Sequence, residues 1–326
     1  MRQEIAIDSA ALNYRYELQL AGATCHVATN SQKLVDSLQQ WRVRENNAES
    51  RSFVMHVLVN EGDNQGFETP HFRGLQHVVI ACFGENNIFT FDLLRLNVTA
   101  TVTQQRAGDQ HFWDRILLPI ALGVLGPALG VVPVHSACLA IDGAALLIAG
   151  TSGAGKSTLS VALAQQGFDF ISDDWTYLSL DHGKLVAHGM SIPAKLLPDA
   201  VTHFPLLDSY PLGLALNQEL AYELPAQDLG ARVHLRCQPQ WFFFLERLPD
   251  EGFSAVPVPS LEAKRYIDGS LERLPPELRE LAAIRSSVAK HVARLSCWKV
   301  SYGGPPSVAV KGLQQFFANA RQDVLI

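Results

Sequence analysis

One glycine-rich segment constrains the fold of this chain more than any other feature. Its residues are, in order, Gly150, Thr151, Ser152, Gly153, Ala154, Gly155, Lys156 and Ser157. They have the spacing G-x-x-x-x-G-K-S, in which the glycines let successive backbone N–H groups point inward around a phosphate chain. A helix that starts at this lysine adds its positive N-terminal end. The segment therefore predicts a strand, a phosphate-binding loop and a helix in immediate succession.

The residues on either side of the loop fit this prediction. The apolar run Ala144–Ala149 reads as the strand before the loop, and residues 156–166 read as the helix after it. Another apolar run, Val134–Ala140, precedes the turn signal Asp142-Gly143 and predicts a hairpin with the loop strand. The pattern is that of an α/β domain built around a P-loop.

The loop residues have predictable roles. Lys156 should reach the β- and γ-phosphates of a nucleotide, and the Ser157 hydroxyl should bind Mg²⁺. The predicted nucleotide-binding set is the eight loop residues together with Thr158. The expected cofactors are ATP and Mg²⁺.

Two adjacent acids, Asp173 and Asp174, follow the next predicted strand, residues 168–172. Ligands of open α/β sheets bind at the carboxyl ends of the strands. One carboxylate can hold Mg²⁺, and a second one beside it can take a proton from an attacking hydroxyl. The alternative is a capped turn, because Asp is common after strands. The upstream loop favours the catalytic interpretation.

His135 lies at the start of the predicted strand pair before the loop. Taken alone, a single histidine beside an apolar run is more often structural than catalytic.

The first hundred residues have a different pattern from the loop region. Tyr14–Leu20 alternates as a half-buried strand does. Further strands are predicted at 52–60, 75–83, 87–93 and 97–104, and Ser31 is placed to cap a helix. We predict a smaller α+β domain over residues 1–107 and the P-loop domain over 108–326, divided at Ala107-Gly108-Asp109. The smaller domain could cover a substrate, dock an acceptor or partner, or stabilise the core.

Composition narrows the class of protein. The net charge of −6 argues against general nucleic-acid binding, which requires a basic surface. The five cysteines are scattered, and none forms a C-x-x-C pair. With no signal-peptide pattern after Met1, the expected location is the cytoplasm. The chain is compatible with a homo-oligomer.

An uncharged segment, residues 116–134, has nearly the length of a membrane-spanning helix. It contains the three prolines Pro119, Pro127 and Pro133, which interrupt helices. We therefore predict a buried helix followed by a turn, with no membrane span.

Three short stretches together resemble a known family. Val134-His135-Ser136-Ala137, the loop at 150–157 and Ile171-Ser172-Asp173-Asp174 are similar to the catalytic domain of the HPr kinase/phosphorylase superfamily. The closer resemblance is to HPr-kinase-related serine kinases of peptide-modification and exopolysaccharide clusters. It covers residues 110 to 320 and implies a compact P-loop fold related to phosphoenolpyruvate carboxykinase.

The resemblance also implies roles for individual residues. His135 matches the family's active-site histidine near the phosphates, and Lys156 and Ser157 match its phosphate and Mg²⁺ ligands. Asp173 matches the acid that acts on the serine hydroxyl, and Asp174 matches the neighbour that assists with the metal.

The chain departs from HPr kinases at two places. Thr158 stands where those enzymes usually have Glu, and Met190-Ser191-Ile192-Pro193-Ala194-Lys195 replaces their Arg-Gly-Leu-Gly signature. In the related kinases, Lys195 would supply positive charge near the phosphates. HPr as a substrate, a hexamer and reverse phosphorolysis are therefore left open.

The expected function is an ATP- and Mg²⁺-dependent kinase that transfers the γ-phosphate to a hydroxyl, first of all to a serine of a protein or peptide. One alternative is a kinase for a small hydroxyl compound such as a sugar. Another is a P-loop NTPase switch, which the lack of Asn-Lys-x-Asp and Leu-Ser-Gly-Gly signatures disfavours. The basic residue that supports the phosphates further along the chain remains open among Lys195, Arg247, Lys264 and Arg265.

Overall fold

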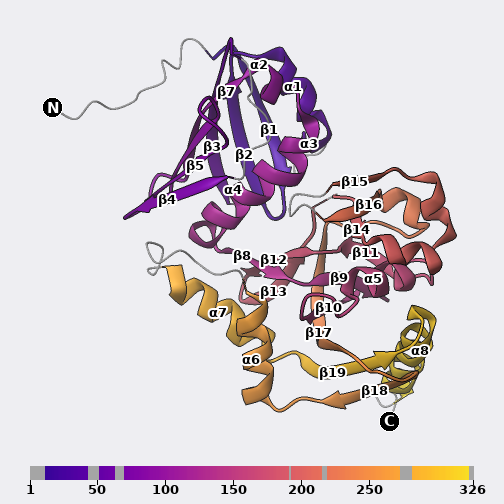
Figure 1. The fold of residues 1–326 in the computed structure, drawn as a ribbon. Coiled ribbons are helices and arrows are strands. Elements are labelled where there is room, and N and C mark those ends of the chain that lie inside the picture. The colour runs from indigo at the N-terminus through magenta and orange to yellow at the C-terminus, as the bar shows by residue number, and fades with distance from the viewer. Residues whose placement is uncertain are drawn as a thin grey trace. The chain divides into compact units, whose positions relative to one another are not determined.

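The computed structural model describes residues 12–42, 51–62, 70–190, 192–214, 219–271 and 281–322. It is a mixed α/β protein with several sheets (Figure 1). The chain divides into two compact units. The first contains the described residues up to Val132 and the start of helix α7, and the second begins at Pro133.

The first unit is built on a seven-stranded sheet with the strand order β1-β2-β3-β7-β6-β5-β4. Its strands are β1 (Tyr14–Leu20), β2 (Ala23–Thr29), β3 (Ser52–Asn60), β4 (His71–Leu75), β5 (Val78–Cys82), β6 (Ile88–Asp92) and β7 (Asn97–Thr103). Strand β3 runs parallel to β2 and to β7, and the other neighbours are antiparallel. Its helical segments are α1 (Gln32–Ser37), η2 (Gln39–Trp41), α2 (Gln104–Ala107), α3 (Gln110–Phe112), η3 (Trp113–Leu117), α4 (Leu118–Leu125) and η4 (Gly126–Leu129).

Most strands of this unit follow the sequence pattern. The predicted strands 14–20 and 52–60 have the observed ends, and 97–104 is one residue too long. The predicted strand 75–83 is wrong at its start, because β5 begins at Val78 and Leu75 ends β4. Strand β4 is an edge strand, and its Leu75 is 75% exposed. An exposed edge strand need not alternate apolar and polar residues, so the sequence pattern does not mark where β4 ends.

The uncharged segment of the chain is buried as a helix. Residues 110–129 are helical, and their length and apolar character would suffice to cross a membrane, but 67% of the most apolar window is buried inside the protein. Phe112 and Trp113 pack against Phe83 and Phe89, with ring centroids 5.0 to 6.1 Å apart. The predicted buried helix and turn are observed.

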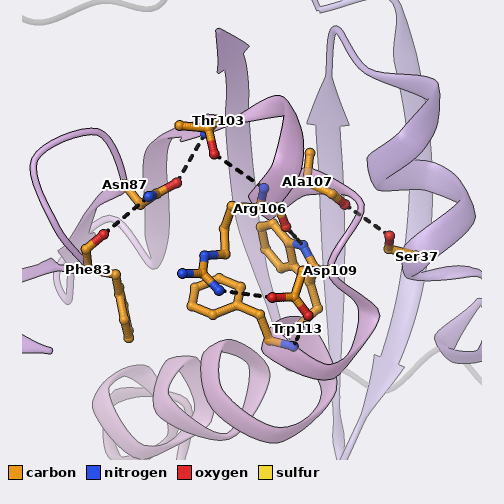
Figure 2. Close-up of polar contacts among 9 residues, drawn as sticks. Ser37, Phe83, Asn87, Thr103, Arg106, Ala107, Asp109 and Trp113 are labelled. Carbon is orange, nitrogen blue, oxygen red and sulfur yellow. Dashed lines mark hydrogen bonds and ion pairs between the residues drawn. The ribbon is translucent and has the colours of Figure 1, made fainter. Parts of the chain in front are cut away.

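Polar side chains fix the path of the chain from β7 into these helices. Thr103 caps α2 by accepting a hydrogen bond from the Arg106 amide, and Asp109 caps α3 by accepting one from the Phe112 amide. Figure 2 shows the Arg106 guanidinium donating to Asp109 at 2.9 Å and the Asn87 amide oxygen accepting from the Thr103 N–H at 3.0 Å. Asp109 therefore marks the start of the helical segment 110–129.

The second unit contains a nine-stranded sheet and a three-stranded sheet (Figure 1). The larger sheet has the order β11-β9-β10-β17-β13-β12-β8, with β19 paired to β17 and β18 paired to β19. Its strands are β8 (Val131–His135), β9 (Ala137–Ile141), β10 (Ala144–Gly150), β11 (Asp169–Ser172), β12 (Trp175–Asp181), β13 (Lys184–His188), β17 (Arg236–Arg247), β18 (Gly252–Pro257) and β19 (Ser296–Gly303). The smaller sheet, ordered β14-β16-β15, consists of β14 (Ala194–Leu196), β16 (Leu220–Leu224) and β15 (Leu212–Leu214).

The chain beyond Pro133 also contains helical segments, some of which contact the larger sheet. They are α5 (Lys156–Ala164), η5 (Pro198–Thr202), η6 (Pro205–Ser209), η7 (Ala226–Leu229), α6 (Ser260–Ser270), α7 (Ala282–Val292) and α8 (Pro306–Gln322). Phe317 of α8 packs against Phe168, Trp241 and Phe243 with ring centroids 5.0 to 6.0 Å apart. This aromatic core holds α8 against the sheet beside the strand that carries the loop.

Two sequence expectations differ from the observed fold. The compact units divide at Val132, later than the predicted boundary after residue 107, because the helices at 110–129 belong to the first unit. The prediction of one strand over the apolar run Val134–Ala140 is wrong. It contains the end of β8 and most of β9, and the two are separated at Ser136.

The five cysteines are free thiols. Cys25 in β2, Cys138 in β9 and Cys297 in β19 are buried. Burial raises the pKa of the Cys25 and Cys138 thiols well above their ordinary value.

Candidate active site

The strand directions bring the loop, the acid pair and His135 to one edge of the sheet. Strand β9 is antiparallel to both β10 and β11, so these two run in the same direction and end at the same edge. Strand β9 begins there, with Ala137 opposite Ile148 of β10. His135, just before β9, therefore lies between the loop after β10 and the acids after β11. Two strand spacings separate the loop strand from the acid strand by about 10 Å.

The loop is a compact turn closed onto helix α5. The Ala154 amide donates to the Thr151 carbonyl at 3.1 Å, and Gly153 and Gly155 have φ of 78° and 87°. Those left-handed values favour glycine. At Gly150 a Cβ atom would lie 2.7 Å from the Leu245 carbonyl oxygen, so the approach of β17 also requires glycine. Residues 151–153 are exposed, and the N-terminal end of α5 begins directly behind the loop.

Lys156 bends over the loop beside both acids. Its Nζ donates to the Gly150 carbonyl at 3.2 Å. Burial holds the pKa of the Lys156 ammonium below its usual value, while the charges of Asp174 and Asp173 act to raise it. The structure therefore brings the predicted phosphate-binding lysine into the field of the predicted acid pair.

Asp173 is buried, with 6% of its surface exposed. Its Oδ1 accepts from the Ser160 hydroxyl at 2.9 Å, and its Oδ2 accepts from the Lys195 backbone N–H at 3.0 Å. Ser157 also hydrogen-bonds to this carboxylate. Burial, followed by the charge of Asp174, raises the pKa of Asp173 to about 6. The Asp173 carboxylate therefore links helix α5 to strand β14 through hydrogen bonds.

Asp174 has a different environment, since 53% of its side chain is exposed. His135 Nε2 lies 2.8 Å from its Oδ1, and the His135 ring stacks on Trp175 at a centroid distance of 5.3 Å. Burial acts to raise the pKa of Asp174, but His135, Lys156 and Lys195 hold it below the usual value. Neighbouring carboxyls with pKa values pushed apart are suited to different tasks, because the one with the higher pKa is the better proton acceptor.

The side chains at this edge offer oxygen ligands. Ser157 contributes a hydroxyl, and Asp173 and Asp174 contribute carboxylates, which are the ligand types that Mg²⁺ takes in proteins. Within the described ranges, no group of three or more His, Cys, Asp or Glu side chains is placed to hold a metal by itself. Magnesium is commonly bound by one or two carboxylates together with phosphate oxygens of a substrate. The donor set fits that arrangement.

Two other predicted residues have simple placements. Thr158 lies in the first turn of α5 and is partly exposed. Lys195 donates through Nζ to Glu219 at 3.0 Å, so its charge is shared with a carboxylate.

Three residues of the site were not predicted. Ser160 binds Asp173 and lies one helical turn after Lys156, a spacing that places both on one face of α5 and could have identified it. Trp175 directly follows the acid pair and stacks on His135. Tyr302 comes from β19, and its hydroxyl lies 2.6 Å from where a Cβ of Gly155 would be. No local pattern marks Tyr302, because its position depends on the pairing of β19 with β17.

Comparisons with known proteins add little to this geometry. No family model matches the chain, and no curated protein matches it. A solved structure that does match is the HPr(Ser) kinase/phosphatase from Coxiella burnetii, at 15% sequence identity. The match covers 60% of this chain and 99% of that chain, with a TM-score of 0.29. A TM-score this low does not establish a shared fold. The function of this chain therefore has to be inferred from the geometry of the site.

Proposed function

We propose that this protein is an ATP- and Mg²⁺-dependent kinase that transfers the γ-phosphate to a hydroxyl group, with a serine of a protein or peptide as the acceptor. The observation that carries the proposal is the position of Lys156 and its loop beside Asp173 and Asp174 at one sheet edge. The resemblance of the motifs to HPr-kinase-related serine kinases supports serine as the acceptor.

The loop and helix α5 would bind the triphosphate. The backbone N–H groups of residues 150–157 and the positive end of α5 supply donors without side-chain charge. Lys156 would exchange its contact with the Gly150 carbonyl for phosphate oxygens. Phosphoryl transfer has a loose transition state, so positioning and electrostatic stabilisation by these groups supply most of the catalysis.

Ser157 and Asp174 would hold the metal. Their oxygen atoms belong to the ligand class of Mg²⁺, and Asp174 keeps a pKa below its usual value, so it is ionised near neutral pH. When bound, Mg²⁺ supplies charge neutralisation to the β- and γ-phosphate oxygens. His135 would orient Asp174 through the contact between its Nε2 and the carboxylate Oδ1.

Asp173 would accept the proton of the attacking hydroxyl. Its buried position beside the loop supports this role, and its hydrogen bonds from Ser160 and from the Lys195 amide hold the carboxylate in one orientation. The acceptor hydroxyl must approach a remaining lone pair of the same carboxylate. Asp174, which is more exposed, is the competing proton acceptor.

The test is transfer of label from γ-labelled ATP in the presence of Mg²⁺. The purified chain is incubated with serine peptides, proteins and sugars, and each product is examined for label. We expect a labelled serine, and we expect Lys156→Ala to abolish labelling, whereas Lys184→Ala, which removes an exposed lysine from β13, preserves it. ATP hydrolysis at an equal rate with and without acceptors, and no labelled product, would contradict the proposal.

A pair of variants separates the two acids. Asp173→Asn should abolish transfer and leave ATP binding largely intact, because the loop and Lys156 remain. Asp174→Asn should weaken Mg²⁺ binding and so raise the Mg²⁺ concentration needed for half-maximal transfer. If Asp173→Asn loses nucleotide binding to the same extent as transfer, its role as the proton acceptor is wrong.

A further inference from the structure

Arg247 stands at the rim of the phosphate loop. It is the last residue of β17, which runs parallel to β10 with Leu245 opposite Gly150. The carboxyl end of β17 therefore lies at the same sheet edge as the loop. A Cβ atom on Gly155 would lie 4.0 Å from the Arg247 Cδ, so the arginine side chain passes directly beside the last loop glycine.

The structure holds this arginine in place through Tyr302. The guanidinium carbon lies 4.2 Å from the centroid of the Tyr302 ring, and Arg247 also hydrogen-bonds to the Tyr302 hydroxyl. Its Nη2 donates to the Gly304 carbonyl at 3.2 Å. Tyr302 is buried, and its hydroxyl is the atom that meets Gly155. The same tyrosine thus supports both the loop glycine and the guanidinium.

The site needs positive charge near the phosphates. Asp173 and Asp174 stand on the far side of the loop, and a triphosphate adds further negative charge. Lys156 is the cation inside the loop, while Lys195 is bonded to Glu219. An arginine has five N–H donors, and contacts with one carbonyl and one hydroxyl leave donors to spare for phosphate oxygens.

We propose that Arg247 binds the phosphates of the nucleotide and is the second cation of the site, positioned by stacking on Tyr302. This inference rests on the proposed function, because it assumes that the loop binds a triphosphate. It selects Arg247 from the basic residues that the sequence left open.

Binding measurements on the full chain test the proposal. Isothermal titration calorimetry with ATP and, separately, with sodium tripolyphosphate distinguishes phosphate contacts from contacts with the base or ribose. Arg247→Ala should weaken binding of both ligands by about 10- to 100-fold, the effect of losing a hydrogen bond to a charged group. Arg247→Gln keeps much of the stem and should show a similar loss, which covers the case in which the alanine variant fails to fold.

The matched control is Arg294→Ala. Arg294 is exposed and precedes the start of β19, at the opposite sheet edge from Tyr302, and its removal should leave both affinities unchanged. If Arg247→Ala weakens ATP but not tripolyphosphate, or weakens neither, Arg247 does not bind phosphate and the inference is wrong. If the wild-type chain binds neither ligand, the proposed function itself fails.

Discussion

Replacing Asp173 by asparagine should change how the stability of the second unit depends on pH. Burial, followed by the charge of Asp174, raises the pKa of this carboxyl from 3.8 to about 6 in the folded chain. Below about pH 3 the carboxyl is protonated in the folded and unfolded chain alike. As the pH rises toward about 6, the unfolded chain releases the proton while the folded chain retains it, so the native state loses stability.

The size of the effect follows from that difference in pKa. It spans about two pH units, and each unit corresponds to about 1.4 kcal/mol, so the wild-type chain should lose about 3 kcal/mol relative to Asp173→Asn between about pH 3 and pH 7. Asparagine cannot ionise and avoids this loss. Its NH₂ group faces donors from Ser160 or the Lys195 amide, a mismatch that adds the same cost at every pH. The change with pH is therefore the informative quantity.

Hydrogen exchange of peptides from β9 to β11, measured in the native state at several pH values without nucleotide or Mg²⁺, reports the unfolding free energy of this sheet. The wild-type value should fall relative to Asp173→Asn as the pH rises. Asp268→Asn removes an exposed carboxylate from α6 and is the control for the loss of one carboxylate. A constant difference for Asp173→Asn, or one of opposite slope, would refute the assignment of a buried carboxyl with a raised pKa.

Three further substitutions test the packing described above. Gly155→Ala should destabilise the second unit by about 1–2 kcal/mol through its φ of 87° alone, and further because the new Cβ would meet the Tyr302 hydroxyl. Chemical denaturation of the double variant with Tyr302→Phe should recover only the stability lost through that contact. If the double variant recovers no stability, the contact is contradicted. Thr103→Ala removes the cap of α2 and should cost about 1 kcal/mol, seen as faster amide exchange in α2, whereas unchanged exchange would count against the cap. Phe317→Ala should cost about 3–5 kcal/mol by opening a cavity in the aromatic core, measured by urea unfolding, and a cost below about 1 kcal/mol would show that α8 does not close this core.

The loop and its flanking elements were predictable because their signals are local. The spacing of Gly150, Gly155 and Lys156 specifies the turn, and the short apolar run before it is typical of a buried strand. The position of Asp173 and Asp174 in the chain has an equally local signal, since they directly follow the short strand β11. In each case the residues that determine the structure are neighbours in the chain.

The surroundings of the loop were not predictable from local patterns. The segment from Val131 to Ile141 is apolar almost throughout, so no periodicity marks the break at Ser136. The pairing of β11 with the other side of β9 joins strands that are separated by the loop and helix α5, and no local pattern marks it. Arg247 and Tyr302 reach the loop only because β17 pairs in parallel with the loop strand β10 and β19 pairs in parallel with β17. Their contacts with Gly155 depend on tertiary structure that a single sequence does not encode locally.

The buried thiols provide a separate chemical probe for each unit. A thiol reacts as its thiolate, so Cys25 and Cys138, which are buried and have raised pKa values, should react with an alkylating reagent only after their strands open. Alkylation of Cys25 would time the opening of the first unit, and alkylation of Cys138 would time the opening of the strand that separates the loop from the acids. A nucleotide that binds at the loop should slow the second reaction, because ligand binding to the native state makes opening less frequent.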